Sequence, residues 1–261
     1  MIFVWWDDVA DGPTNMATDE ALAAESQRRG ALLVRIYGWS TTTVSLGAFQ
    51  PLVEARSVGE IAEVPLVRRP SGGGAIVHGS DLTYAAAVPK THPWGATPQS
   101  LYDAFHGAMR QALAAEGVAA TLWPGGAAAP AEPQPFFCFD RRSQGDLVVL
   151  GDDAAPGGHG LKIMGSAQRR LEGVVLQHGS LLLGHNPDVA GRARHPGLAD
   201  LPGMKALAGP RVRQLAERWL GLVAETWGVA PAYAGGRFGG PAGEIRERAA
   251  RFLDDRWTGR R

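Results

Sequence analysis

The chain has 261 residues, of which 45% are hydrophobic and 20% are charged, and its formal net charge at pH 7 is zero. This balance is ordinary for a globular domain with a sizeable core, and it argues against a dedicated nucleic-acid-binding protein, which usually has a basic excess. The opening MIFVWWDDVADG lacks the basic segment of a signal peptide, and no apolar run reaches the length of a membrane span, so we expect a cytoplasmic protein with neither nucleic-acid nor membrane partners.

The first third of the chain predicts a strand, a helix and then a series of short strands. The opening MIFVWW has the composition of a strand. A helix is predicted over residues 14–30, because Thr14 or Asn15 can cap its start, basic side chains fill its last turn and Gly30 ends it. Segments of strand-like composition follow at residues 31–39, 41–49, 64–69, 74–79 and 81–89.

The rest of the chain predicts further helices and a second group of strands. A long amphipathic helix is predicted over residues 97–117, with Thr97 as its cap and Pro98 in its first position. Residues 124–135 are rich in Pro, Gly and Ala, which predicts a loop. The remaining predicted elements are strands at residues 146–151, 161–170 and 173–183, a hairpin tip at 151–160, and helices near 211–227 and 243–255.

The strands occur in clusters with helices between the clusters, rather than in strict alternation with helices. This order predicts an α+β fold with a largely antiparallel or mixed sheet. Because no repeat or break in composition marks a boundary, residues 1–261 are interpreted as a single domain, with C-terminal helices from about residue 205.

Three adjacent glycines follow a pair of arginines in RRPSGGGAIVHGSDLTY, residues 68–84. Neither the P-loop spacing nor the dinucleotide-binding spacing is present, and the residues after Gly74 predict a strand rather than the helix that a phosphate site would need. Glycines between strands let a second molecule approach the backbone and leave N–H groups free to bind an oxygen atom. A turn without a ligand is the alternative, but the neighbouring Arg68, Arg69 and His78 favour a binding site.

Cys138 is the only cysteine and lies in PFFCFD. A single cysteine excludes an intramolecular disulfide and a cysteine-based zinc site, and the seven histidines show no metal-binding spacing, so no metal site is predicted. A lone cysteine among phenylalanines is often a small buried hydrophobic residue, and apolar surroundings disfavour a reactive thiolate. A nucleophilic Cys138 would therefore need a cationic partner, for which Lys162, His78 and His178 are the candidates.

Lys162 is one of only three lysines among 26 basic residues, the others being Lys90 and Lys205. Arginine and lysine differ in geometry and acidity, so an arginine-rich chain can keep lysine where a compact ammonium is required. Lys162 lies in LKIMGSAQRR, where strand alternation would place it on one face with Met164 and Ser166. If that face is the pocket side, the three side chains line one cavity. A solvated strand lysine is the alternative.

Several of these segments, in this order and at this separation, resemble the lipoate-protein ligase and octanoyltransferase family, which is related in fold to the biotin protein ligases. The segments are RRPSGGGAIVHGSDLTY, LKIMGSAQRR and VVLQHGSLLL, and the earlier NMATDEAL and RIYGWSTTTVSLGAFQ resemble the N-terminal region of the same family. The resemblance covers residues 1–185. It implies a single catalytic domain of the biotin/lipoate protein ligase type, with a mixed, mostly antiparallel sheet flanked by helices.

The resemblance also implies roles for individual residues. Lys162 would contact the acyl carbonyl or acyl phosphate. Arg69 and the three glycines would line the carboxyl end of the acyl pocket, and His78 would form part of its wall. The residues that the resemblance implies for substrate binding are Arg69, Ser71, Gly72, Gly73, Gly74, Ala75, His78, Gly165, Ser166 and His178.

Two chemistries occur in the family that the chain resembles. Its ligases use ATP, with magnesium, to form lipoyl-AMP from free lipoate before the acyl group passes to a lysine of a carrier domain. Its cysteine-dependent octanoyltransferases take octanoate from acyl carrier protein and hold it as a thioester on a cysteine. They then pass it to a lysine of a lipoyl domain or of the glycine-cleavage H protein, and need no cofactor.

The transferases are the better match. Their acyl-bearing cysteine precedes a phenylalanine in the loop ahead of the lysine strand, and Cys138–Phe139 has this place, 24 residues before Lys162. HGSDLTYAAAV resembles their H-x-x-(D/E)-L-T-Y pattern, and the sequence after residue 185 is expected to be too short for the accessory domain of the ligases. Gly74, in contrast, is ligase-like, because these transferases often carry arginine there.

We therefore hypothesise that the Cys138 thiolate attacks the octanoyl thioester of acyl carrier protein. Lys162 and backbone N–H groups near the glycines would stabilise the oxyanion, and His78 or His178 would serve as proton shuttle. The alternative is an ATP-dependent lipoate-protein ligase in which Cys138 is a packing residue. A third reading is a non-catalytic module that binds acylated carriers, which a Cys138 buried far from Lys162 would favour.

Overall fold

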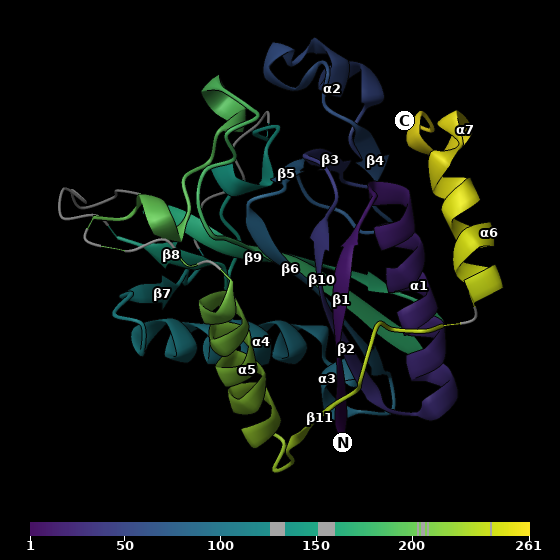
Figure 1. Cartoon of the computed structure of the whole chain (residues 1–261), viewed down its shortest axis with the longest axis vertical. Helices are drawn as coiled ribbons and strands as arrows, with labels where there is room; N and C mark the ends of the chain where they lie inside the picture. The colour runs from purple at the N-terminus through teal and green to yellow at the C-terminus, as the bar shows by residue number, and fades with distance from the viewer. Residues whose placement is uncertain (126–133, 151–159, 203, 205–206, 208, 241) are drawn as a thin grey trace.

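The computed structural model describes residues 1–125, 134–150, 160–202, 204, 207, 209–240 and 242–261, and within them eight strands form one central sheet (Figure 1). In spatial order the strands are β11 (Pro231–Tyr233), β1 (Ile2–Ala10), β2 (Leu32–Trp39), β6 (Asp81–Pro89), β10 (Val174–Leu182), β9 (Leu161–Arg170), β8 (Leu147–Val149) and β7 (Ala120–Leu122). Strand β1 runs parallel to β2 and β11, and the other described neighbours are antiparallel. The predicted α+β fold with a mixed, mostly antiparallel sheet is confirmed.

A second, smaller sheet carries the glycine run. It consists of β3 (Thr43–Leu46), β4 (Leu66–Arg68) and β5 (Ile76–His78), in the order β4-β3-β5. Strand β3 pairs in parallel with β4 and in antiparallel with β5, so the two strands that flank the glycines lie on opposite sides of β3. The glycine run is therefore a crossing between two separated strands. A simple hairpin turn, the alternative considered from the sequence, is wrong.

Helices cover both faces of the central sheet (Figure 1). The helices of the described residues are α1 (Gly12–Arg29), α2 (Leu52–Ser57), α3 (Pro93–Ala96), α4 (Pro98–Ala114), α5 (Pro210–Glu225), α6 (Ala242–Leu253) and α7 (Asp255–Thr258), with short 3₁₀ turns η1 (Gly59–Ile61), η2 (Cys138–Asp140), η3 (Gly191–Ala193) and η4 (Leu198–Asp200). No helix among the described residues has the length and apolar character that crossing a membrane requires.

Two hydrophobic cores form because side chains alternate between the faces of a strand. In β2, Val34 and Ile36 pack in one core with α4 and α5, whereas Leu33 and Tyr37 pack in the other core with α1 and α6. The same alternation in β10 directs Val175 and Leu181 to the first core. Val174 and Leu176 of the same strand belong to the second core, so β10 is held between two packed layers.

The boundaries of two predicted helices change in detail. Helix α1 begins before the predicted cap, because Asp11 Oδ1 accepts the Thr14 N–H at 2.8 Å and Thr14 lies in the first turn. Gly30 ends this helix in the left-handed conformation, as predicted. Helix α4 starts at Pro98 as predicted, but the Thr97 side chain makes no capping hydrogen bond.

The C-terminal third contains an element that the sequence reading missed. It was predicted as helices alone, but β11 adds to the edge of the central sheet through parallel pairing with β1. A strand of three residues that begins with proline carries no usable periodicity. The predicted loop over 124–135 and the predicted hairpin tip over 151–160 lie mostly outside the described residues.

Candidate active site

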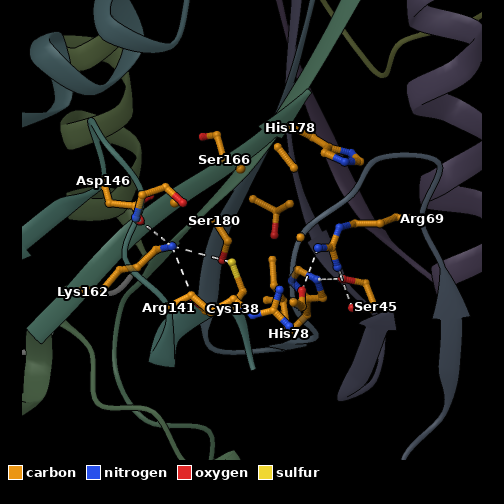
Figure 2. A pocket seen from close by; sticks show the side chains of 18 of the residues that line it. Ser45, Arg69, His78, Cys138, Arg141, Asp146, Lys162, Ser166, His178 and Ser180 are labelled. Carbon is orange, nitrogen blue, oxygen red and sulfur yellow. Dashed lines mark hydrogen bonds and ion pairs between the residues drawn. The ribbon is translucent and has the colours of Figure 1, made fainter. Parts of the chain in front are cut away.

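A cavity of about 180 Å³ lies between the central sheet and the small sheet. Side chains from β2, β3, β5, β9 and β10 line it, together with Met16 of α1 and Cys138 of η2. This volume is more than ten times what a single water molecule needs, so the cavity has room for a small organic group. Figure 2 shows the polar side chains that converge on it.

Cys138 and Lys162 meet in this cavity (Figure 2). Lys162 Nζ lies 3.7 Å from Cys138 Sγ and 3.3 Å from the Cys138 carbonyl oxygen. The lysine side chain is 3% exposed, and the cysteine is half-buried. An ammonium at this distance stabilises a thiolate electrostatically, and it can also donate to an oxyanion formed beside the sulfur. Cys138 is therefore paired with a buried cation, and the solvated-lysine alternative is wrong.

Asp146 forms an ion pair with Lys162. Its Oδ2 lies 2.8 Å from Lys162 Nζ and accepts the Ser143 N–H at 2.6 Å, and its Oδ1 accepts the Tyr102 hydroxyl at 2.6 Å. The carboxylate is 1% exposed, so the ion pair is buried. Burial, followed by the nearby Asp146 charge, raises the pKa of Tyr102 well above its usual value, which keeps the phenol a hydrogen-bond donor. Sequence reasoning missed Asp146, although an acidic residue opening a strongly apolar strand is a signal of a buried, paired carboxylate.

A shift in strand pairing brings Lys162 to the cavity. Leu147 of β8 pairs with Met164, but the next residue, Val148, pairs with Lys162, so Ile163 is extra on β9. As a result Lys162 faces the cavity while Met164 is buried in the core with α4 and α5. The expectation that strict alternation would place Lys162, Met164 and Ser166 on one cavity-lining face is therefore wrong for Met164.

Gly165 leaves space for the Lys162 side chain. A Cβ atom at position 165 would lie 2.5 Å from Lys162 Cε and 2.8 Å from Lys162 Nζ. The lysine side chain thus occupies the volume that a side chain on its own strand would fill. A glycine here is a packing requirement of the Cys138–Lys162 pair.

Gly74 leaves space for the segment that carries Cys138. A Cβ atom at position 74 would lie 2.7 Å from the Cys138 nitrogen and 2.8 Å from the Phe136 oxygen. The next residue of the crossing, Ala75, is hydrogen-bonded to the cysteine segment: Ala75 N donates to Phe136 O at 2.9 Å, and Cys138 N donates to Ala75 O at 2.8 Å. The third glycine therefore lets the cysteine segment dock against the crossing by backbone hydrogen bonds.

Arg69 holds the glycine crossing in place. Its guanidinium donates to the carbonyl oxygens of Ser45, Gly72 and Gly74, each at 2.7 Å. The side chain is buried, and burial lowers the pKa of Arg69 to about 10, against a smaller opposing effect of Cys138. Arg69 therefore shapes the wall of the cavity while keeping its positive charge at neutral pH.

Two buried hydrogen-bonded chains of serine, histidine and aspartate each contribute a histidine to the lining of the cavity. In one, His78 Nε2 lies 2.8 Å from Ser45 Oγ and His78 Nδ1 lies 2.9 Å from Asp81 Oδ2, with the ring stacked on Trp39 at 4.0 Å. Burial works to raise the pKa of Asp81, but the His78 charge and hydrogen bonds from His78, Ser180 and Thr83 outweigh it and lower that pKa.

The second chain joins His178 to Ser71 through Nε2 and to Asp19 through Nδ1, the latter at 3.1 Å. Asp19 in turn accepts from Arg35 NH1 at 2.7 Å. Both histidines thus have both ring nitrogens in hydrogen bonds. No described contact joins Cys138 to His78 or His178, so of its three predicted partners the cysteine contacts Lys162.

Ser166 is tied into a separate buried network beside the cavity. Its Oγ lies 2.7 Å from the Tyr84 hydroxyl and 2.7 Å from His106 Nε2. Burial lowers the pKa of His106 to about 4, although Asp146 and the Gly145 carbonyl oppose this, so the ring is neutral at pH 7. This network ties β9 to α4 beside the Cys138–Lys162 pair.

Residues 11–205 match the lipoyl protein ligase A/B catalytic domain. The chain belongs to this family. It is 35% identical over 192 residues to octanoyltransferase LipM of Brevibacillus brevis, covering 67% of this chain and 63% of the relative. It is also 35% identical over 182 residues to octanoyltransferase LipM of Bacillus subtilis, covering 67% and 62%. The chain thus spans less than two thirds of the length of these relatives.

A solved structure extends the likeness to nearly the whole chain. A putative lipoate protein ligase from T. acidophilum superposes with a TM-score of 0.73 at 19% identity, over 99% of this chain and 98% of that one. This similarity shows a shared fold. The family resemblance derived from the three motifs is therefore confirmed, and so is the fold that it implied.

The structure places most of the predicted site residues around the cavity. Those that line it are Cys138, Lys162, Arg69, Gly73, Gly74, His78, Gly165, Ser166 and His178. Ser71 and Gly72 line a neighbouring hollow, and Ala75 is buried behind the cavity wall. Within the described parts of the chain, no three side chains of His, Cys, Asp or Glu gather as ligands of a metal ion would.

Proposed function

We propose that this chain transfers an octanoyl or lipoyl group from a carrier-protein thioester to a lysine of a protein acceptor, with Cys138 as the acyl carrier. The observation that supports this most directly is the 3.7 Å contact between Cys138 Sγ and the buried Lys162 ammonium at the cavity. The similarity to octanoyltransferases named LipM points to the same reaction class.

In the first half-reaction, the Cys138 thiolate attacks the carbonyl carbon of the donor thioester. A new C–S bond forms, and the bond between the carbonyl carbon and the donor sulfur breaks. The donor leaves as a thiolate and takes up a proton. Lys162 stabilises first the thiolate and then the oxyanion of the tetrahedral intermediate. Met16, Tyr37, Trp39 and Ile76 offer apolar surface for the acyl chain and keep water from the acyl-enzyme.

In the second half-reaction, the neutral amine of an acceptor lysine attacks the acyl-cysteine. A C–N bond forms, the C–S bond to Cys138 breaks, and the departing thiolate recovers the proton that the amine loses. Since a thioester is converted to an amide, no ATP is consumed. We propose acyl carrier protein as donor, and a lipoyl domain or the glycine-cleavage H protein as acceptor.

The test is acyl-enzyme formation without ATP. Incubation with octanoyl-acyl carrier protein should give one octanoyl adduct by intact mass, which hydroxylamine removes and which Cys138→Ala abolishes. Addition of a lipoyl domain should discharge the adduct with transfer to its lysine. Absence of the adduct, together with ATP-dependent transfer of free lipoate, would assign the chain to the ligases. No transfer under either condition would leave a carrier-binding module.

A further inference from the structure

A second hollow lies across the glycine run from the catalytic cavity. Phe49 and the loop residues 70–72 line it, and Phe49 is 72% exposed. Four arginines line it as well, Arg169 and Arg170 from the end of β9 and Arg260 and Arg261 from the end of the chain. The proposed function assigns no role to this hollow.

The C-terminal segment is held beside the glycine run by backbone and side-chain hydrogen bonds. Arg68 Nε donates to Thr258 O at 2.8 Å, and Trp257 Nε1 donates to Arg68 O at 2.9 Å. Leu52 N donates to Arg261 O at 3.0 Å. Arg260 and Arg261 are thus fixed next to a loop almost 190 positions away in sequence, so their position at the hollow is a property of the fold.

Within the part of the chain that the structure describes, none of the four arginines forms an ion pair with a carboxylate, although the charge of Glu20 acts on Arg260. Among the described residues, the ion pairs formed by other arginines include Arg251 with Glu20 and Arg256 with Asp254, and none involves an arginine of the hollow. Burial, followed by the charges of Arg169, Arg261 and Arg251, lowers the pKa of Arg260 against the smaller opposing charge of Glu20. Like charges gathered without an anion repel one another, and an anionic ligand relieves that repulsion.

The hollow and the cavity adjoin along two elements. Gly165 and Ala167 of β9 line the cavity, and Arg169 continues the same face of the strand into the hollow. On the loop, Gly72 lines the hollow while the exposed Gly73 lines the cavity. A molecule that reaches from one space to the other therefore passes Gly72 and Gly73, beside the Phe49 ring and the Arg69 guanidinium.

The reach is short. Ala75 is three positions after Gly72, which is at most ~11 Å of backbone. The Cys138 nitrogen is hydrogen-bonded to Ala75 O at 2.8 Å. A thioester on a flexible arm can thus reach Cys138 while the other end of the arm lies among the arginines.

We propose that the arginine hollow binds the phosphodiester of the phosphopantetheine arm of the acyl donor, with the arm lying over Gly72 and Gly73 and its thioester at Cys138. Guanidinium groups recognise phosphate by bidentate, charge-assisted hydrogen bonds, which suits a site made of arginine rather than lysine. This inference rests on the proposed function for its donor, but its site is separate from the catalytic pair.

The binding test uses carrier protein with and without its arm. The unmodified protein should bind holo-acyl carrier protein more tightly than the apo form, measured by fluorescence anisotropy. The double variant Arg169→Gln/Arg260→Gln should lose this preference by about tenfold or more, the range expected for hydrogen bonds to a charged group. The matched control is Arg218→Gln, an exposed arginine of α5 on the opposite face of the sheet. Arg170→Gln serves as a second hollow variant if the double variant unfolds.

The kinetic test compares octanoyl-phosphopantetheine with octanoyl-pantetheine, which lacks the phosphate. The ratio of their kcat/KM values should fall by about tenfold in the double variant and stay unchanged in the control. An unchanged ratio would overturn the proposal. A rise in the double variant that is confined to the KM for the lipoyl domain would also overturn it and would assign the hollow to the acceptor. Arginine-dependent binding of ATP, without binding of phosphopantetheine, would overturn it as well. Arginine-dependent binding of holo-carrier without any Cys138 adduct would reject the transferase function and keep the hollow.

Discussion

Gly74→Ala is the sharpest test of how the cysteine segment is positioned. The added Cβ would lie 2.7 Å from the Cys138 nitrogen, 2.8 Å from the Phe136 oxygen and 2.9 Å from Arg141 Nε. Two of these atoms belong to the backbone, so no side-chain rotation relieves the contact. Ordinary contact begins at 3.4 Å, which requires a displacement of about 0.7 Å. Gly74 is not among the glycines with positive φ, so the effect is steric.

The expected magnitudes follow from this displacement. Overpacking of this kind costs about 1–3 kcal/mol of folding stability. Because Cys138 would move relative to Lys162, acyl-enzyme formation should slow by roughly 10- to 100-fold, since a misplacement of 1 Å costs on the order of 100-fold. The assays are urea unfolding and the rate of adduct formation by intact mass.

Gly107→Ala is the matched control, because Gly107 lies in α4 and its Cβ would meet nothing within 4 Å. It should stabilise the protein by about 0.5–1 kcal/mol and leave the rate unchanged. A Gly74→Ala protein with the stability and acylation rate of this control would refute the idea that the missing side chain lets the cysteine segment dock.

Two further predictions concern buried charge. Asp146→Asn leaves the Lys162 ammonium buried without its partner and should cost about 3–5 kcal/mol in urea unfolding, part of which the double variant Asp146→Asn/Lys162→Met recovers. For His106, burial lowers the folded-state pKa from 6.5 to about 4, so between these values the unfolded chain binds a proton that the folded chain does not. The neutral His106 therefore makes its full contribution to the free energy of unfolding above pH 6.5, and this contribution falls by about 3 kcal/mol as the pH drops to 4. The His106→Gln variant should not show this loss.

Each prediction has a clear contrary result. If Asp146→Asn is no less stable than the double variant, the carboxylate does not compensate the lysine charge. If the unmodified protein and His106→Gln lose the same stability between pH 7 and pH 4, the neutral, buried state of His106 does not contribute to acid sensitivity.

Local sequence patterns determined much of the architecture. Strand-like composition located β9 and β10, and Gly30 and Pro98 marked where helices end and begin. These signals act over a few residues, through backbone conformation and side-chain alternation, so a single sequence carries them. The glycine run was likewise identified as a place of close approach, and Cys138 and Lys162 as a candidate pair.

Only the tertiary structure decided which atoms meet. The extra residue at Ile163 reverses the alternation of β9 and sends Met164 into the core, which depends on pairing with β8 rather than on β9 itself. Asp146 became part of the site because burial of the Lys162 ammonium requires an opposite charge, and no spacing along the chain identifies that partner.

For the glycine run, too, the sequence determined one property and the tertiary structure another. Its sequence determined that the backbone there is open to approach. The identity of what approaches was decided by the fold, which brings the cysteine segment to Gly74 and Arg260 to the hollow beside Gly72. Contacts between segments so far apart depend on how whole layers pack, and local pattern contains no measure of that packing.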